Sequence, residues 1–319
     1  MDLFVFLLLL TSASIVESVS LAPKNIFTRL QFHCEYKTNE LQNTSTCVIR
    51  DFHPGTSLFH IENPENSTRL EFVNSQHVRI PKAVFLEVPS LESLNLSSTG
   101  VRRIQKSSFD NAMCLVSLDL SHNLLQIIAK STFKRALNLQ ELYLDNNQIE
   151  VVEYSAFKYL RNLTILTLND NRIKYLSDHA FEQLSNLRTL LLNNNAITVI
   201  SSALKPLLSL ETLTLDNNAL HYVRIKVLNK HLRHLKSITL RKNAWICAGM
   251  KIMTDYLEAN MVRSDLEDDG QEVCTQDEDV MLMMNEKDLM EIQELSVSTF
   301  VNPAFSRHFN KKRSNGVYF

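Results

Sequence analysis

The side chains that could do acid-base chemistry are carboxylates recurring along the middle of the chain, among them Asp119, Asp145 and Asp216. Two carboxylates can act as general acid and base when desolvation raises the pKa of one of them. Nothing in the sequence would desolvate these acids, and the Gly-x-Ser-x-Gly, Walker and His-Glu-x-x-His motifs are absent. We interpret the acids as a solvated surface, with a calcium site as the minor alternative. Neither an enzyme nor a cofactor is predicted.

Four of the five cysteines fall into two local pairs. Cys34 and Cys47 flank the first strand-like run, and Cys247 and Cys274 flank a segment that follows the central part of the chain. In an exported chain, the pairs Cys34–Cys47 and Cys247–Cys274 are expected to be disulfides. A metal site is the alternative, but no cysteine pair lies near closely spaced histidines.

Composition and the N-terminal residues indicate export. The net charge of −2 gives no general basic field for nucleic acid, and only 5 glycines argue against phosphate-binding loops. Leu3 to Leu10 are almost wholly Leu, Phe and Val, and Ser18 and Ser20 suit signal peptidase. This predicts a cleaved signal peptide over residues 1–20, with a buried helix or signal anchor as the alternative. No later run predicts a membrane span or lipid anchor, so we expect a secreted, extracellular protein.

A motif repeats through the middle of the chain. Leu91-Glu-Ser-Leu94-Asn-Leu96 recurs at a nearly constant spacing, in copies that start at Leu115, Leu139, Leu163, Leu187, Leu210 and Leu235. The Leu-x-Leu alternation predicts a short strand with one apolar face, which must stack on its neighbours to be buried. An eroded copy with Leu70 and Phe72 lies upstream, which makes about eight repeats.

Two more rows follow the same period. An asparagine stands three residues after the last leucine of six motifs: Asn123, Asn147, Asn171, Asn195, Asn218 and Asn243. Its amide can satisfy the turning backbone of its own coil and the next. A phenylalanine recurs once in each of five consecutive repeats: Phe85, Phe109, Phe133, Phe157 and Phe181. These rings are predicted to fill the core behind the sheet.

The fifth cysteine, Cys114, belongs to neither of the two expected pairs. It precedes Leu115, at the position where later repeats have Asn138, Asn162 and Asn186. We favour a buried free thiol that acts as a small apolar residue. The alternative is an intermolecular disulfide, which would make a covalent dimer.

The motif Leu-x-x-Leu-x-Leu-x-x-Asn-x-Leu with its phenylalanine resembles extracellular leucine-rich-repeat proteins of the 24-residue type. Asn243-Ala-Trp245-Ile-Cys247 is similar to that family's C-terminal cap, although Ala248 and Gly249 stand where a second cysteine is usual. With its signal and N-terminal cysteine pair, the chain resembles the leucine-rich immune proteins of mosquitoes. Some of those proteins hold a complement-like thioester protein in solution. Longer members add a coiled coil, so the resemblance is to the coil-less type.

The expected fold is an α/β solenoid, a leucine-rich-repeat horseshoe with a parallel inner sheet and disulfide caps. We divide the chain into a signal peptide (1–20), an N-terminal cap (21–66), the repeats (67–245), a C-terminal cap (246–279) and a short helix with a disordered tail (280–319). Within the C-terminal cap, Met250 to Leu257 is predicted to be an amphipathic helix.

Four sequons for N-glycosylation lie in the exported part, at Asn43, Asn66, Asn95 and Asn162. Asn43 and Asn66 have polar, loop-like surroundings. Asn95 stands at the outward position of a predicted strand, so a sugar there would cover part of the inner arc.

A ligand-binding surface is predicted on the inner arc. Residues between or just after the motif leucines point there, and the candidates are Asp119, Tyr143, Asp145, Thr167, Leu191 and Asp216. Tyrosine is enriched at interface hot spots, and the acids favour a partner with a basic patch. The basic Lys236, Arg241 and Lys242 predict an arc of bipolar charge. A merely solvated face, with binding at edges or caps, is the alternative.

These observations predict a secreted, non-enzymatic recognition protein of innate immunity that binds a protein or microbial-surface ligand. The alternative is an extracellular matrix or developmental adhesion protein. Proteins of that kind usually have a cysteine cluster before the repeats, where this chain has only Cys34 and Cys47. No nucleic-acid partner is expected, and the oligomeric state stays open.

Overall fold

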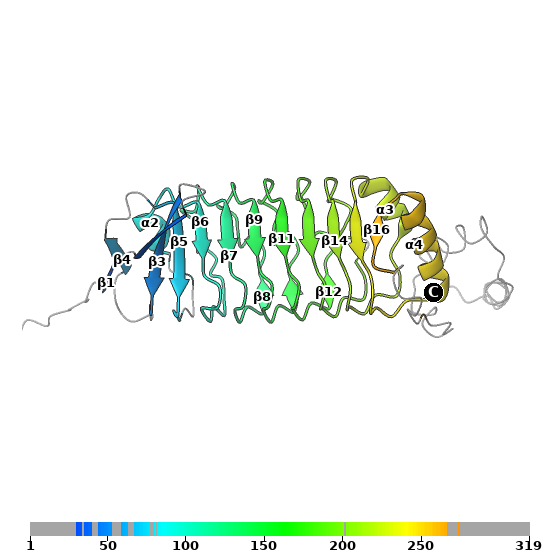
Figure 1. Cartoon of the computed structure of the whole chain (residues 1–319), viewed down its shortest axis with the longest axis horizontal. Coiled ribbons are helices and arrows are strands. Elements are labelled where there is room, and N and C mark those ends of the chain that lie inside the picture. Colours follow the sequence, from blue (N-terminus) through cyan, green and yellow to red (C-terminus); the bar gives the residue numbers. More distant parts are fainter. Residues whose placement is uncertain are drawn as a thin grey trace, which may run out of the picture.

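The computed structural model of the chain is a solenoid with one short inner strand per coil (Figure 1). It describes residues 30–33, 35–39, 44–52, 59–62, 67–76, 80, 82–200, 202–266 and 274. The main sheet has eleven strands, which in chain order are β2 (Glu35–Asn39), β3 (Thr44–Arg50), β5 (Arg69–Val73), β6 (Ser93–Asn95), β7 (Ser117–Asp119), β9 (Glu141–Tyr143), β11 (Ile165–Thr167), β13 (Thr189–Leu191), β14 (Thr212–Thr214), β15 (Ser237–Thr239) and β16 (Arg263–Ser264).

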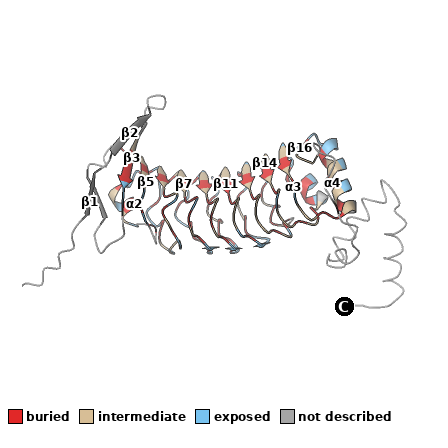
Figure 2. Ribbon diagram, turned by 60° about the horizontal axis from the view of Figure 1, so that its bottom comes forward, coloured by how far each residue is buried: buried red, intermediate tan, exposed pale blue. Residues whose placement is uncertain are grey.

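The strands pair in the register that the motif predicts. Leu94 lies opposite Leu118, and Leu142 opposite Leu166, so equivalent leucines of successive coils stack. Every pair in the sheet is parallel except the β2–β3 hairpin. The predicted parallel inner sheet is confirmed, and Figure 2 shows it along the concave side of a shallow arc.

The sheet continues past the recognisable motif at both ends. The eroded repeat forms β5, with Leu70 opposite Leu94. Beyond it, Cys47 of β3 lies opposite Leu70 and is buried in the core. At the other end β16 adds a strand beside β15. The eroded repeat was therefore predicted correctly, whereas β3 and β16 lack the Leu-x-Leu pattern, so the motif alone does not reveal that they join the sheet.

Stacked phenylalanines fill the space behind the sheet, as predicted. Ring centroids of consecutive members lie 5.3 to 6.2 Å apart from Phe85 to Phe181, and all five rings are buried. In the next coil, fully buried Leu204 follows Phe181 and continues the apolar core.

The predicted asparagine ladder is also present. Asn171 Nδ2 donates to the backbone oxygen of Leu144 in the preceding coil (3.0 Å) and to that of Leu168 in its own coil (3.1 Å). Its Oδ1 accepts from Ile149 N at 2.9 Å. Its Nδ2 also donates to the Asn169 oxygen at 3.1 Å, so one amide closes four backbone hydrogen bonds where the chain leaves the strand. The residue before it, Asp170, takes a left-handed φ of 53°, which Asn and Asp tolerate better than most residues.

On the outer side of the coils, three two-residue strands form a second parallel sheet, β8 (Ile127–Ile128), β10 (Val151–Val152) and β12 (Tyr175–Leu176). The short helix α2 (Val84–Glu87) lies on the first full coil. Near the N-terminal end, β1 (Leu30–His33) and β4 (Phe59–Glu62) pair in a separate parallel sheet.

Two helices close the C-terminal end of the solenoid. They are α3 (Ile225–His231) and α4 (Cys247–Ala259), and α4 confirms the predicted cap helix with wider bounds. Fully buried Trp245 donates from its indole nitrogen to the Leu240 oxygen at 3.0 Å, which fixes the entry to α4. No helix within the described ranges is long and apolar enough to cross a membrane.

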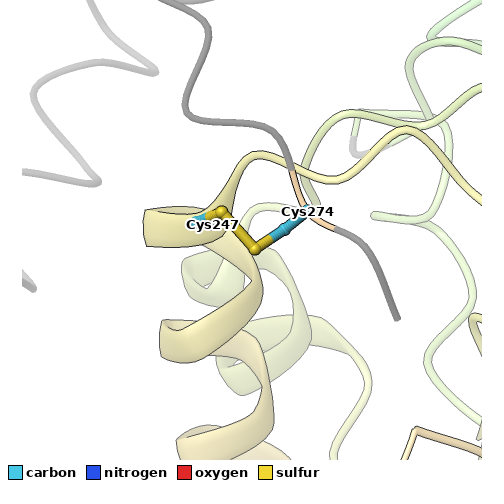
Figure 3. Close-up of a disulfide and its surroundings, with 2 residues drawn as sticks. All are labelled: Cys247 and Cys274. Atoms are coloured by element: carbon cyan, nitrogen blue, oxygen red, sulfur yellow. A yellow bond between two sulfur atoms is a disulfide. The ribbon is translucent and has the colours of Figure 1, made fainter. Parts of the chain in front are cut away.

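The C-terminal disulfide is as predicted. Cys247 at the start of α4 is bonded to Cys274, with their Cα atoms 4.8 Å apart (Figure 3). Cys47 is also disulfide-bonded, but Cys34 lies outside the described residues, so that pairing stays a prediction. The signal peptide, Asn43, Asn66 and residues 280–319 lie outside them as well.

Candidate functional site: the inner sheet face

The inner face is formed by the outward-pointing residues of the main-sheet strands β7, β9, β11, β13, β14 and β15. Tyr143, Thr167 and Leu191 occupy equivalent positions of three adjacent strands and lie side by side in the ladder. Tyr143 and Leu191 are half-buried, and so is Ile165, which lies one row away. The strands therefore place an aromatic and two aliphatic side chains on one partly exposed patch, which we call the central patch.

Thr167 holds a neighbouring acid and is itself buried, only 5% exposed. Its hydroxyl donates to Asp145 Oδ1 at 2.7 Å and accepts from Leu144 N at 3.2 Å. Asn146 Nδ2 donates to the other Asp145 oxygen at 2.9 Å. Thr167 is thus better placed to position the Asp145 carboxylate than to touch a ligand.

The same arrangement recurs along the face. Thr214 Oγ1 donates to Asn193 Oδ1 at 2.8 Å, and Thr239 Oγ1 donates to Asp216 Oδ1. In each case the threonine in the middle of a strand motif holds the polar residue that directly follows the last motif leucine of the preceding coil. In the sequence, the threonine and the polar residue that it holds are separated by 21 to 23 residues, close to the period of the repeat.

The potential around Tyr143 is negative. Its hydroxyl donates to Glu141 Oε2 at 3.3 Å. Burial raises the pKa of Tyr143, and the charges of Glu141, Asp119 and Asp145 raise it further. The phenol therefore stays protonated at neutral pH, and the surrounding carboxylates present an anionic surface. Asp119 Oδ1 is fixed by the Ser121 backbone N–H at 2.8 Å.

An ion-pair cluster is formed by the residues that directly precede β13, β14 and β15. Glu211 lies 2.8 Å from Arg188 and 2.5 Å from Lys236, and these cations lower the pKa of Glu211. Lys236, predicted to belong to a basic end of the arc, is therefore partly neutralised. Such exposed pairs contribute little stability.

Hydrogen bonds hold the carboxylates of the inner face in place. Among the described residues, no three His, Cys, Asp or Glu side chains are grouped so that they could hold a metal ion. The carboxylates on the inner face accept hydrogen bonds from threonine, asparagine or backbone groups. A fixed surface of this kind can bind a partner by shape and charge.

The described sequons differ in exposure. Asn95 lies half-buried on β6, and its Oδ1 accepts from Ser97 N at 2.8 Å. Asn162 is exposed at the coil edge, and its Nδ2 donates to the Leu137 oxygen at 3.2 Å. Asn138 and Asn186 make the equivalent bond in neighbouring coils, at 2.7 and 2.9 Å.

Cys114 is free, as we favoured, but it is exposed, so the expectation of a buried thiol is wrong. The residue stands at the same coil-edge position as Asn138, which is exposed as well. A side chain there points away from the stacked leucines because Leu115, the next residue, takes the inward position and is fully buried.

Comparison with known proteins identifies the repeat. A family model described as leucine rich repeat matches residues 115–173, 137–197 and 161–220. The chain is similar to the LRIM1/APL1C complex, with a TM-score of 0.55 and 19% identity over 68% of this chain and 47% of that chain. It is also similar to the APL1 leucine-rich repeat domain, with a TM-score of 0.54 and 18% identity over 68% of this chain and 65% of that chain. It thus spans less than two thirds of either structure.

A third structure, human 5T4 (Wnt-activated inhibitory factor 1, trophoblast glycoprotein), is similar with a TM-score of 0.57 and 25% identity, over 79% of this chain and 96% of that one. No curated protein sequence matches the chain. The matched repeat model, the stacked Leu-x-Leu strands and the asparagine ladder together show that this chain has the leucine-rich-repeat fold.

Proposed function

We propose that this protein is a secreted, non-enzymatic recognition protein that binds a protein or microbial-surface ligand through the inner face of its repeats. The observation that carries the proposal is the central patch of Tyr143, Ile165 and Leu191 beside the fixed carboxylates of Asp119 and Asp145. Apolar and aromatic side chains ringed by polar groups are typical of interface hot spots.

The central patch can bury apolar area without disturbing the fold. The inward leucines of the same strands, such as Leu142 and Leu166, already fill the core. Tyr143 and Ile165 on the other side of the sheet keep surface that a partner can cover. Burying it contributes roughly 25 cal/mol for each Å² removed from water.

The fixed acids define the partner's charge. Asp145 accepts hydrogen bonds from Thr167 and Asn146, so its carboxylate is oriented before any partner arrives. A group that is already oriented loses little entropy on binding. The proposed partner therefore presents lysine or arginine to this side of the central patch.

The setting that we propose is innate immunity, with the chain exported into extracellular fluid. The repeats and caps resemble the leucine-rich immune proteins of mosquitoes, and the LRIM1/APL1C complex has the same fold. Induction of the protein by infection would support this setting. Constant expression in matrix-producing tissue would favour adhesion instead.

The test is the double variant Tyr143→Ala/Asp145→Lys. We expect it to capture its partner from the native extracellular fluid at least about tenfold less well, because it loses a hot-spot side chain and reverses a charge. The matched control is Tyr175→Ala/Asp178→Lys, which changes the same residue types on the exposed outer side of the coils.

Circular dichroism first establishes that both variants are folded. Equal capture by the folded inner-face variant and the wild type would refute the inner-face proposal. Loss of capture in the control variant alone would move the site to the outer coils.

A further inference from the structure

The outer parts of two consecutive coils are strongly cationic. Residues 101–113 and 125–137 together contain six lysines and arginines and one acid, Asp110; the cations are Arg102, Arg103, Lys106, Lys130, Lys134 and Arg135. The equivalent part of the next coil, residues 149–161, is balanced, with two acids and two cations. The excess charge is therefore local and does not follow from the net charge of −2.

The phenylalanine ladder shows how these cations are arranged. Lys82, Lys106 and Lys130 each stand three residues before a ladder phenylalanine, and all three are exposed. The rings of Phe85, Phe109 and Phe133 are 5.9 and 5.3 Å apart. The lysines therefore leave successive coils at about the same interval, one above another along the outer side of the stacked coils seen in Figure 1.

Four further cations extend the lysine row to either side. Lys134 and Arg135 directly follow Phe133 and are exposed, while the ring itself is buried. In the adjacent coil Arg102 and Arg103 are also exposed. We call the whole set the outer cationic face: Lys82, Arg102, Arg103, Lys106, Lys130, Lys134 and Arg135.

The protein leaves most of this charge without a counter-ion. Within the described part of the chain, Arg102, Arg103, Lys106, Lys134 and Arg135 make no ion pair. Lys130 lies 4.2 Å from the centre of the Tyr154 ring and donates to its hydroxyl, so it is held on this surface as a cation. Like charges on neighbouring coils repel each other, and a bound polyanion would relieve that repulsion.

We propose that the outer cationic face binds a sulfated glycosaminoglycan, independently of the partner on the inner face. Cations repeated from coil to coil match anionic groups repeated along a linear chain. Arg102, Arg103 and Arg135 add planar guanidinium groups, whose paired N–H donors suit the oxygens of sulfate as they suit those of phosphate. Expected export would place this face among extracellular polysaccharides.

Heparin affinity chromatography of the full secreted protein tests the proposal. We expect wild type to be retained on heparin at physiological salt and to elute earlier from a sulfonate cation exchanger. The variant Lys106→Glu/Lys134→Glu/Arg135→Glu should bind soluble heparin at least about tenfold more weakly. The slope of log Kd against log salt should fall by about one for each cation–sulfate pair that the variant removes.

The matched control is Lys174→Glu/Lys205→Glu/Arg233→Glu, which makes the same change in net charge at exposed positions outside the outer cationic face. It should bind heparin like wild type, and so should the inner-face variant Tyr143→Ala/Asp145→Lys. If the glutamate variant misfolds by circular dichroism, the corresponding glutamine variant replaces it.

Three results would overturn the proposal. The first is wild type that passes through the heparin column at physiological salt. The second is an equal loss of binding in the test and control variants, which would reduce the effect to net charge. The third is binding to vesicles containing phosphatidylserine with no binding to heparin, which would assign the face to a membrane.

Discussion

Individual leucines of the motif carry the stability of the solenoid. Leu166 is fully buried between Leu142 and Leu190 of the neighbouring strands. Its chain neighbour Ile165 points the other way and is half-buried on the inner face. Two adjacent residues of similar size therefore have different roles: Leu166 packs in the core, and Ile165 lies at the proposed binding surface.

The change Leu166→Ala should lower the free energy of unfolding by about 2–5 kcal/mol, because it removes buried methyl groups and leaves a cavity. The control Ile165→Ala should cost less than about 1.5 kcal/mol, because solvent already reaches that side chain. Denaturant titration of both variants checks the pair. Equal losses would contradict the strand register that places Leu166 inside and Ile165 outside.

Among the elements, those at the two ends of the solenoid must cover apolar side chains that a neighbouring coil covers elsewhere. Each inner coil is covered by another coil, but the last repeat would expose its leucines to water without a cap. Here α4 covers that end, with Met253 and Leu257 buried and Cys247 bonded to Cys274. The caps thus replace a missing neighbour.

Replacing both cysteines of the cap, Cys247→Ser/Cys274→Ser, should lower stability by about 2–4 kcal/mol, because the bond closes a long loop in the unfolded chain. The control Cys114→Ser should leave it almost unchanged, since Cys114 is free and exposed. Thermal unfolding measures both. Non-reducing peptide mapping should find Cys114 alkylated in the native protein, and a Cys114–Cys114 peptide would establish a covalent dimer instead.

At the scale of the whole molecule, the solenoid separates surfaces that a globular domain would merge. The inner sheet presents the central patch and fixed acids, and the outer coils present the cationic face. Between them lies the coil edge with exposed Asn138, Asn162 and Asn186. Because the three surfaces are formed by different residues, a substitution on one leaves the others in place.

This separation predicts where a sugar is tolerated. Glycopeptide mapping of the secreted protein should find Asn162 occupied, because its side chain is exposed at the coil edge. The variant Asn162→Gln should lose that glycan and keep its capture of the inner-face partner. If its capture changes more than about threefold while Tyr143→Ala/Asp145→Lys binds normally, the partner contacts the coil edge.

The solenoid could be predicted from the sequence, since the Leu-x-Leu strands, the asparagine ladder and the phenylalanine ladder recur in one register from coil to coil. The sequence also predicted the cap helix and the Cys247–Cys274 bond. The solenoid depends on contacts between neighbouring coils, which the period of the repeat encodes directly.

The exposure and contacts of side chains outside those rows could not be predicted from the repeat. Thr167 and Tyr143 occupy the same motif position, yet one is buried holding Asp145 and the other keeps exposed surface. Cys114 is exposed because its coil-edge position points away from the core. The cations of residues 101–137 become one face only when the coils are stacked. Each of these outcomes depends on which side chains of the neighbouring coil come into contact. The motif of a single repeat does not specify those contacts.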